Sequence, residues 1–124
     1  MSREGRPLSP HLTIYRWPIT MTLSILHRMT GVALSVGLIV YVLWLESIAY
    51  DFIPFDGVAT IMSSWIGQLM LLGWCFSFFF HLCNGVRHLV WDTGRLFEKK
   101  QVDQSAWIVL IASIALTAGY WITI

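Results

Sequence analysis

The sequence predicts an all-α integral membrane protein, with three transmembrane helices in one domain over residues 1–124. Of these residues, 56% are hydrophobic and only 12% are charged, and the mean hydropathy is +0.67. A soluble domain of this length could not hide so much apolar surface. The chain contains three long apolar stretches, and a membrane-spanning helix needs roughly 20 mainly apolar residues. The net charge of +1 and the membrane class argue against a nucleic-acid partner.

Each apolar stretch is long enough for one span. The first covers about residues 20–50, and Pro18 is well placed for the first turn of its helix. The second covers about residues 59–90, which is long enough to project beyond the hydrocarbon. The third covers about residues 105–124. We therefore expect two polar connections and helices that alternate in direction across the membrane.

The positive charges are confined to one side of this predicted topology. Every Lys and Arg lies before or at the start of the first span, at the end of the second, or in the connection that follows: Arg3, Arg6, Arg16, Arg28, Arg87, Arg95, Lys99 and Lys100. The connection between the first two spans contains Asp51 and Asp56 and no positive charge. The positive-inside rule then places the N-terminus in the cytoplasm, or in the matrix of a mitochondrion.

The cysteines do not indicate a metal or redox motif. Cys75 and Cys83 both lie in an apolar stretch, with no Cys-x-x-Cys and no Cys-x-x-Cys-His spacing. This excludes a zinc ribbon, a thioredoxin motif and covalent c-type haem attachment. A zinc site is not expected, because the histidines lie on two helices with no thiolate or deep carboxylate beside them. The two cysteines are read as small buried apolar residues.

Ionisable residues converge at the inner end of the first two spans. Residues three and four apart share a helix face, so two polar stripes form. The first span carries Ser24, His27 and Arg28, and the second carries His81, Gly85, His88 and Asp92. Because the two helices run in opposite directions, both stripes reach the same side of the membrane.

The stripe on the second span has the pattern expected of a haem site. His81 is six residues, hence about 9 Å, deeper than Arg87. A deep imidazole can bind haem iron, and donors nearer the boundary can hold the propionates. His27, Arg28 and His88 are the candidates for that shallower layer. As an axial ligand within the same chain, His27 would be too shallow.

Other interpretations of these residues stay open. Gly85 either permits close packing of a neighbouring helix or leaves room for a flat ligand. A single intramembrane histidine often bonds between helices, and arginines near a helix end often reach to the headgroups. A proton relay or a lipid-headgroup site would use the same residue types. The convergence of several such groups at one depth favours a functional site.

Three motifs resemble one family. The stretches "RPLSPHLTIY" (6–15), "SILHRMTG" (24–31) and "HLCNGVRHLVWDTG" (81–94) are similar to the cytochrome b membrane-anchor subunit of succinate dehydrogenase, respiratory complex II. The resemblance implies three transmembrane helices paired with a second small anchor subunit. It also implies one haem b between the two subunits, with one axial histidine from each.

The resemblance also assigns roles to individual residues. His81 matches the axial ligand to the haem iron. His27 and Arg28 match positions near the haem propionates, and His88 is placed near a propionate as well. Ser24 and Arg28 match positions at the ubiquinone site, where a hydroxyl and a guanidinium would donate hydrogen bonds to a quinone carbonyl.

The implied function is electron transfer from succinate to ubiquinone, in the respiratory chain and the tricarboxylic acid cycle. The chain has no flavin or dinucleotide fingerprint and no set of iron–sulfur cysteines. Succinate oxidation must therefore belong to partners, and the resemblance implies that these are a flavoprotein and an iron–sulfur subunit that dock on the inner side. The alternative is a purely structural anchor without a cofactor. The sequence does not separate succinate oxidation from fumarate reduction.

The N-terminal stretch "MSREGRPLSPHL" (1–12) has neither an apolar signal region nor an amphipathic presequence. We therefore expect a multi-pass protein of the bacterial cytoplasmic membrane, or a mature chain of the mitochondrial inner membrane. The first span then serves as its own targeting signal.

Overall fold

The computed structural model describes residue 11 and residues 14–50 and 54–124. In this part of the chain the regular structure is entirely helical: α1 (Ile19–Tyr50), α2 (Phe55–Ser63), α3 (Trp65–Asp92) and α4 (Lys99–Thr123). Among the described helices, α1, α3 and α4 are long and apolar enough to cross a membrane. The predicted all-α membrane fold is confirmed.

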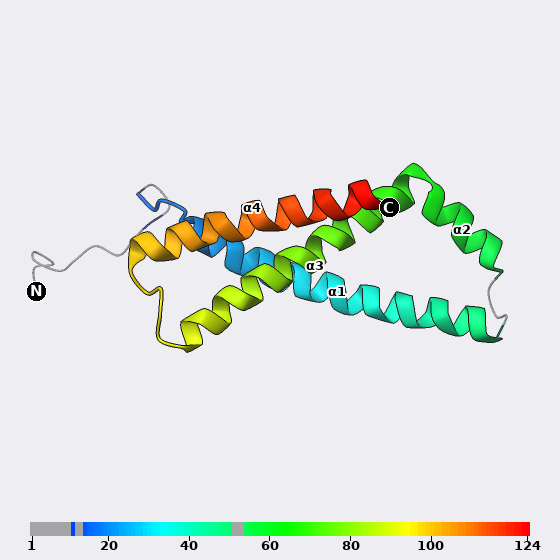
Figure 1. The fold of residues 1–124 in the computed structure, drawn as a ribbon, viewed down its shortest axis with the longest axis horizontal. Helices are drawn as coiled ribbons and strands as arrows, with labels where there is room; N and C mark the ends of the chain where they lie inside the picture. The colour runs from blue at the N-terminus through cyan, green and yellow to red at the C-terminus, as the bar shows by residue number, and fades with distance from the viewer. Residues whose placement is uncertain (1–10, 12–13, 51–53) are drawn as a thin grey trace, which may run out of the picture.

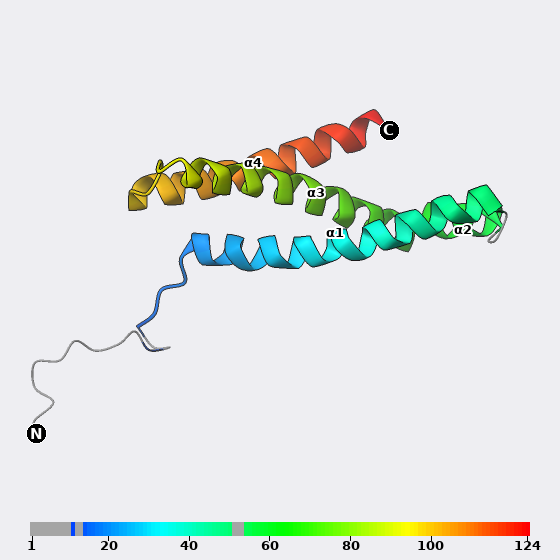
Figure 2. The same cartoon turned by 90° about the horizontal axis from the view of Figure 1, so that it is seen from below.

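The three long helices run along the long axis of the molecule (Figure 1). The start of α1, the end of α3 and the start of α4 lie at one end. The end of α1, the short α2 and the C-terminus lie toward the other (Figure 1). Seen from the perpendicular direction, the end of α3 lies beside the start of α4 and apart from α1, whereas the start of α3 lies at the level of α1 and α2 (Figure 2). Helix α3 is central, because it packs against both α1 and α4.

The predicted second segment, 59–90, is divided into two helices at Ser64. This residue has an extended backbone (ψ 157°), and its hydroxyl accepts a hydrogen bond from the Gly67 amide at 3.2 Å. A Cβ atom added to Gly67 would collide with the carbonyl oxygen of Ile61, so only glycine permits this tight turn. The apolar run continues through the break, so hydropathy gave no sign of it. Serine favours such a helix start because its oxygen caps a free amide.

Helix α4 begins at Lys99 rather than near residue 105. Its first turn forms in the polar connection, where the Val102 amide donates to the Glu98 carbonyl at 2.9 Å. Hydropathy marks only the part of a helix that lies in hydrocarbon, whereas the hydrogen-bonded helix can extend beyond it. The longer α4 brings Val102 and Ser105 beside the end of α3.

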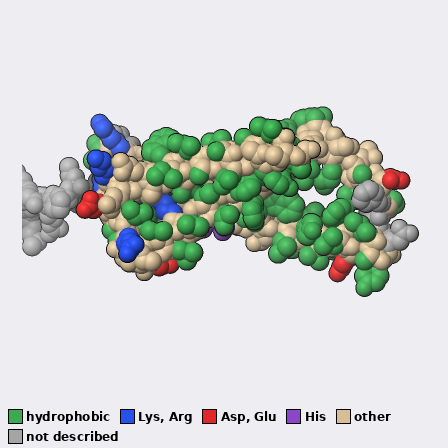
Figure 3. Space-filling view, in the orientation of Figure 1, with side chains coloured by type: hydrophobic (Ala, Val, Ile, Leu, Met, Phe, Trp, Pro, Cys, Tyr) green, Lys and Arg blue, Asp and Glu red, His purple; other side chains and the backbone are tan. Residues whose placement is uncertain are grey.

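Few apolar side chains are buried within the chain. Among the described residues the buried apolar ones are Leu23, Phe80, Ala106 and Val109. Many large hydrophobic side chains are instead exposed. On the face seen in Figure 3 they are spread along the helices, and the visible Lys and Arg gather at the end where α1 begins. This is the distribution expected where lipid, rather than water, surrounds the helices.

Candidate functional site

Three histidines from α1 and α3 form one cluster. The rings of His27 and His81 are stacked, with centroids 3.9 Å apart and planes inclined by 9°. His88 is next, with its ring centroid 5.3 Å from that of His27. His27 is therefore level with His81, although its spacing in the sequence suggested a shallower position. Which residues of two helices lie at the same depth depends on how the helices cross. The spacing of residues along one helix does not give this information.

Thr30 and Gly31 of α1 surround the His81 ring. The Thr30 hydroxyl donates to the His27 carbonyl at 3.0 Å, and its oxygen lies 3.2 Å from Nδ1 of His81. A Cβ atom at Gly31 would come within 3.1 Å of Cε1 of His81, so glycine lets the ring approach α1 closely. In the described part of the chain, Nδ1 is the ring nitrogen of His81 that makes a hydrogen bond. Thr30 was not among the residues predicted from the sequence, because threonine in an apolar helix usually bonds only to its own backbone.

Ser24 and Arg28 lie one turn apart on α1, beside the histidine cluster in sequence. Ser24 is half-buried and Arg28 is exposed. Neither side chain makes a hydrogen bond to another described residue, so both retain donors for a bound group. The i, i+4 spacing places the two donors on one face of the helix.

Gly85 lies between His81 and His88 on α3, and the space beside it is open. A Cβ atom at Gly85 would meet no atom of the described chain within 4 Å. Gly85 therefore does not mediate packing against another described helix of this chain. His88 and Asp92 are exposed on the same stripe, and the His88 ring packs edge-on against Trp91 at 4.9 Å. A flat ligand or a helix of another chain remains the explanation for the missing side chain.

Arg87 belongs to a different face of α3. Its side chain is buried and donates to Ser105 Oγ at 2.8 Å and to the Val102 carbonyl at 3.0 Å, both on α4. Its guanidinium carbon also lies 4.1 Å from the centre of the Trp91 ring. A further long contact joins Arg87 Nη1 to Asn84 Oδ1 at 3.4 Å. Arg87, to which the sequence analysis gave no role, thus connects α3 to α4.

The residues of this chain fit a haem. Nδ1 of His27 is buried without a hydrogen-bond partner among the described residues, beside the His81 ring. Such an atom is unfavourable unless a ligand or another chain satisfies it. Within the described residues, no three His, Cys, Asp or Glu side chains are grouped to hold a metal ion. A haem needs only one imidazole from each side, so this chain would supply one ligand.

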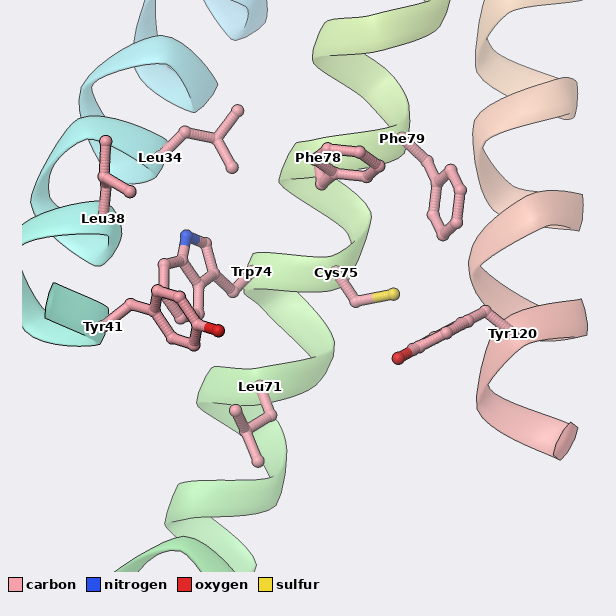
Figure 4. Close-up of a pocket in the computed structure, with 9 residues that line it drawn as sticks. All are labelled: Leu34, Leu38, Tyr41, Leu71, Trp74, Cys75, Phe78, Phe79 and Tyr120. Atoms are coloured by element: carbon pink, nitrogen blue, oxygen red, sulfur yellow. The ribbon is translucent and has the colours of Figure 1, made fainter. Parts of the chain in front are cut away.

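A cavity of about 690 Å³ lies farther along the helices. Its lining is almost entirely apolar: Tyr41 of α1 faces Trp74 of α3, and Cys75 faces Tyr120 of α4 (Figure 4). No histidine or arginine lines it. The cavity lacks the basic donors that a haem propionate requires, so the histidine cluster is the candidate site.

The sequence of the chain is similar to those of known proteins. A family model described as "Succinate dehydrogenase/Fumarate reductase transmembrane subunit" matches residues 2–120. The chain belongs to this family. The resemblance seen in the three motifs, to a cytochrome b membrane-anchor subunit of complex II, is thereby confirmed.

Individual relatives agree with the family match. The succinate dehydrogenase cytochrome b556 subunit of Rickettsia prowazekii is 45% identical over 117 residues, which cover 94% of this chain and 91% of the relative. The cytochrome b556 subunit of Paracoccus denitrificans is 34% identical, with 94% and 89% covered. The mitochondrial cytochrome b560 subunit of Sus scrofa is 37% identical, with 94% and 70% covered.

Proposed function

We propose that this chain is the haem b-binding membrane anchor of a succinate dehydrogenase and forms part of its ubiquinone site. The observation that carries the proposal is the stacked His27–His81 pair between α1 and α3, next to the open space at Gly85. The relatives are named cytochrome b556 and b560 subunits, and these names support a b-type haem as the cofactor.

Different residues of the site would contact the iron and the propionates of the haem. Nε2 of His81 would bind the iron, and His27, His88 and Arg28 would hold the propionates through charge-assisted hydrogen bonds. When bound, the haem supplies a one-electron redox centre. An exposed Arg28 and an exposed His88 are accessible to such a ligand.

Ser24 and Arg28 donate hydrogen bonds to the quinone. Both are donors without a partner among the described residues, and a quinone carbonyl accepts hydrogen bonds but offers none. Their position near the start of α1 places them at the side where the positive charges gather. Electrons then reach the quinone from a partner subunit on that side.

The other functions of the proposed complex belong to other subunits. A second small anchor subunit would supply the other ligand to the iron, and an iron–sulfur subunit and a flavoprotein subunit would carry out succinate oxidation. The N-terminus faces these soluble subunits, in the cytoplasm of a bacterium or the matrix of a mitochondrion. Lipid surrounds the exposed apolar faces.

His81→Ala in the assembled complex tests the ligand assignment. The variant loses or alters the reduced-minus-oxidised absorbance of b-type haem, while the chain still inserts into the membrane. Cys83→Ala, which changes a half-buried residue of the same helix, keeps the normal spectrum. An unchanged low-spin spectrum in His81→Ala would rule out His81 as the ligand. A wild-type complex with no reducible haem would leave the cofactor-free anchor as the function.

A further inference from the structure

We infer that Thr30 is a positioning residue for His81: its hydroxyl oxygen accepts the proton of Nδ1 and thereby directs Nε2 to the iron. The inference rests on the proposed function, since it concerns how the imidazole that would bind the haem iron is held. It assigns a role to a residue outside the stripes of histidines and donors.

We infer the direction of this bond from the two hydrogen-bond partners of Thr30. The Thr30 hydroxyl has one hydrogen, which it donates to the His27 carbonyl at 3.0 Å. Its oxygen can then only accept from the second neighbour, Nδ1 of His81 at 3.2 Å. A neutral imidazole carries one ring proton, so a proton on Nδ1 leaves a lone pair on Nε2. This is the tautomer that coordination of iron through Nε2 requires.

The surroundings of Thr30 make the contact persistent. Only 6% of Thr30 is exposed, so water does not compete for its hydroxyl. Gly31 lets the ring approach α1, and the stacked His27 ring covers one face of it. The His81 imidazole is therefore held by a hydrogen bond at one nitrogen and by packing on its face. Such outer contacts commonly fix the orientation of a ligand imidazole and strengthen its electron donation.

The inference has a specific consequence for the haem. A stronger electron donor stabilises ferric iron, so loss of the Thr30 hydroxyl raises the haem midpoint potential. Removing an outer partner of this kind typically lowers affinity by about 10–100-fold. The haem occupancy of the purified complex falls accordingly.

The experiment uses the assembled complex with Thr30→Val, which keeps the shape but lacks the hydroxyl, and Thr30→Ser, which keeps the hydroxyl. Thr117→Val on α4 is the matched control: Thr117 is also 6% exposed, and its hydroxyl donates to the Ser113 carbonyl at 2.7 Å. Midpoint potential, haem content and the electron paramagnetic resonance signal of low-spin haem are measured for each. We expect a raised potential and lower haem content in Thr30→Val, and near-normal values in Thr30→Ser and Thr117→Val.

Several results would overturn the inference. It fails if Thr30→Val keeps the wild-type potential, if Thr30→Ser changes as much as Thr30→Val, or if Thr117→Val shifts equally. It also fails if Thr30→Val and Thr30→Ala both prevent assembly, because Thr30 is then a structural residue. A normal spectrum in His81→Ala would instead refute the proposed haem ligand. Loss of haem in His81→Ala with no effect of Thr30→Val refutes the Thr30 role alone.

Discussion

Arg87 and His88 are adjacent in the chain and yet face different helices. His88 lies on the stripe that meets His27 of α1, whereas Arg87 is buried against α4. Successive residues of a helix are about 100° apart, so one short motif can serve two interfaces. The same motif therefore contains candidate haem residues on one face and a connection between α3 and α4 on the other.

Loss of the Arg87 side chain should weaken the α3–α4 contact without removing the haem. Arg87→Leu removes the hydrogen bonds to Ser105 Oγ and to the Val102 carbonyl, although the Ser105 hydroxyl still donates to that carbonyl at 2.9 Å. Because hydrogen bonds between membrane helices contribute modestly, we expect a loss of about 1–2 kcal/mol in stability. Thermal unfolding of the complex in detergent measures it. Arg95→Leu, at an exposed position, is the control, and an equal effect of both variants would contradict the prediction.

Substitution of the donors on α1 should impair quinone reduction more than assembly. Ser24→Ala and Arg28→Leu each remove a hydrogen-bond donor, and one charge-assisted bond corresponds to about 1.5–3 kcal/mol. We expect the KM for ubiquinone to rise roughly tenfold or more in Arg28→Leu and less in Ser24→Ala. Steady-state quinone reduction by the purified complex measures this. Ser35→Ala, at an exposed α1 position, is the control. Wild-type quinone kinetics in both variants would remove these residues from the site.

At the scale of the helices, α1 and α3 approach each other at two glycines of α1. Gly31 faces His81, and Gly37 faces the indole ring of Trp74, with which an added Cβ atom would collide. Close approach at small residues is how membrane helices gain packing energy, since lipid is as apolar as the helix surface. The Gly37–Trp74 contact and the His27–His81 pair therefore belong to the same α1–α3 interface.

The fit at Gly37 predicts a cost for even a small side chain. Gly37→Ala should destabilise the α1–α3 pair by about 1–3 kcal/mol, as overpacking commonly does. The penalty should disappear when Trp74 is replaced by Ala, because the collision is with its ring. Gly73→Ala, where the structure leaves open space, should be neutral or stabilising. Thermal unfolding of Gly37→Ala, Trp74→Ala, their double variant and Gly73→Ala tests this. If Gly37→Ala remains destabilising in the Trp74→Ala background, the indole ring is not the cause.

At the scale of the whole molecule, the chain has a small polar interior and an apolar exterior. Its buried polar residues among those described are Thr30, Ser47, Ser77, Asn84, Arg87, Ser113 and Thr117. Small polar side chains allow helices to pack closely and bond to their own backbones in lipid. The apolar exterior needs lipid or partner helices, which agrees with a subunit of a larger membrane complex.

The distribution of charge predicts the orientation of the whole chain. A reporter fused after Phe97, between α3 and α4, should read as cytoplasmic in a bacterial host. A reporter fused after Ile124 should read as external, because the chain crosses the membrane once more through α4. Alkaline phosphatase activity and fluorescent-protein emission at both sites measure the orientation. The reverse pattern would show that the positive charges do not face the cytoplasm.

The membrane class, the three long helices and the importance of the His81 motif could be read from the chain alone. Hydropathy, charge placement and motif spacing are local properties. The structure confirmed the three long helices and the family match confirmed the family, whereas the role of His81 and the orientation of the chain stay predictions. The helix break at Ser64 was not predicted, because it depends on a single capping serine in an otherwise apolar stretch, and one residue barely changes the hydropathy of the segment. The stacking of His27 on His81, the Thr30 contact and the turn of Arg87 toward α4 required the folded chain. They depend on how helices cross and rotate, which close contacts between distant residues decide.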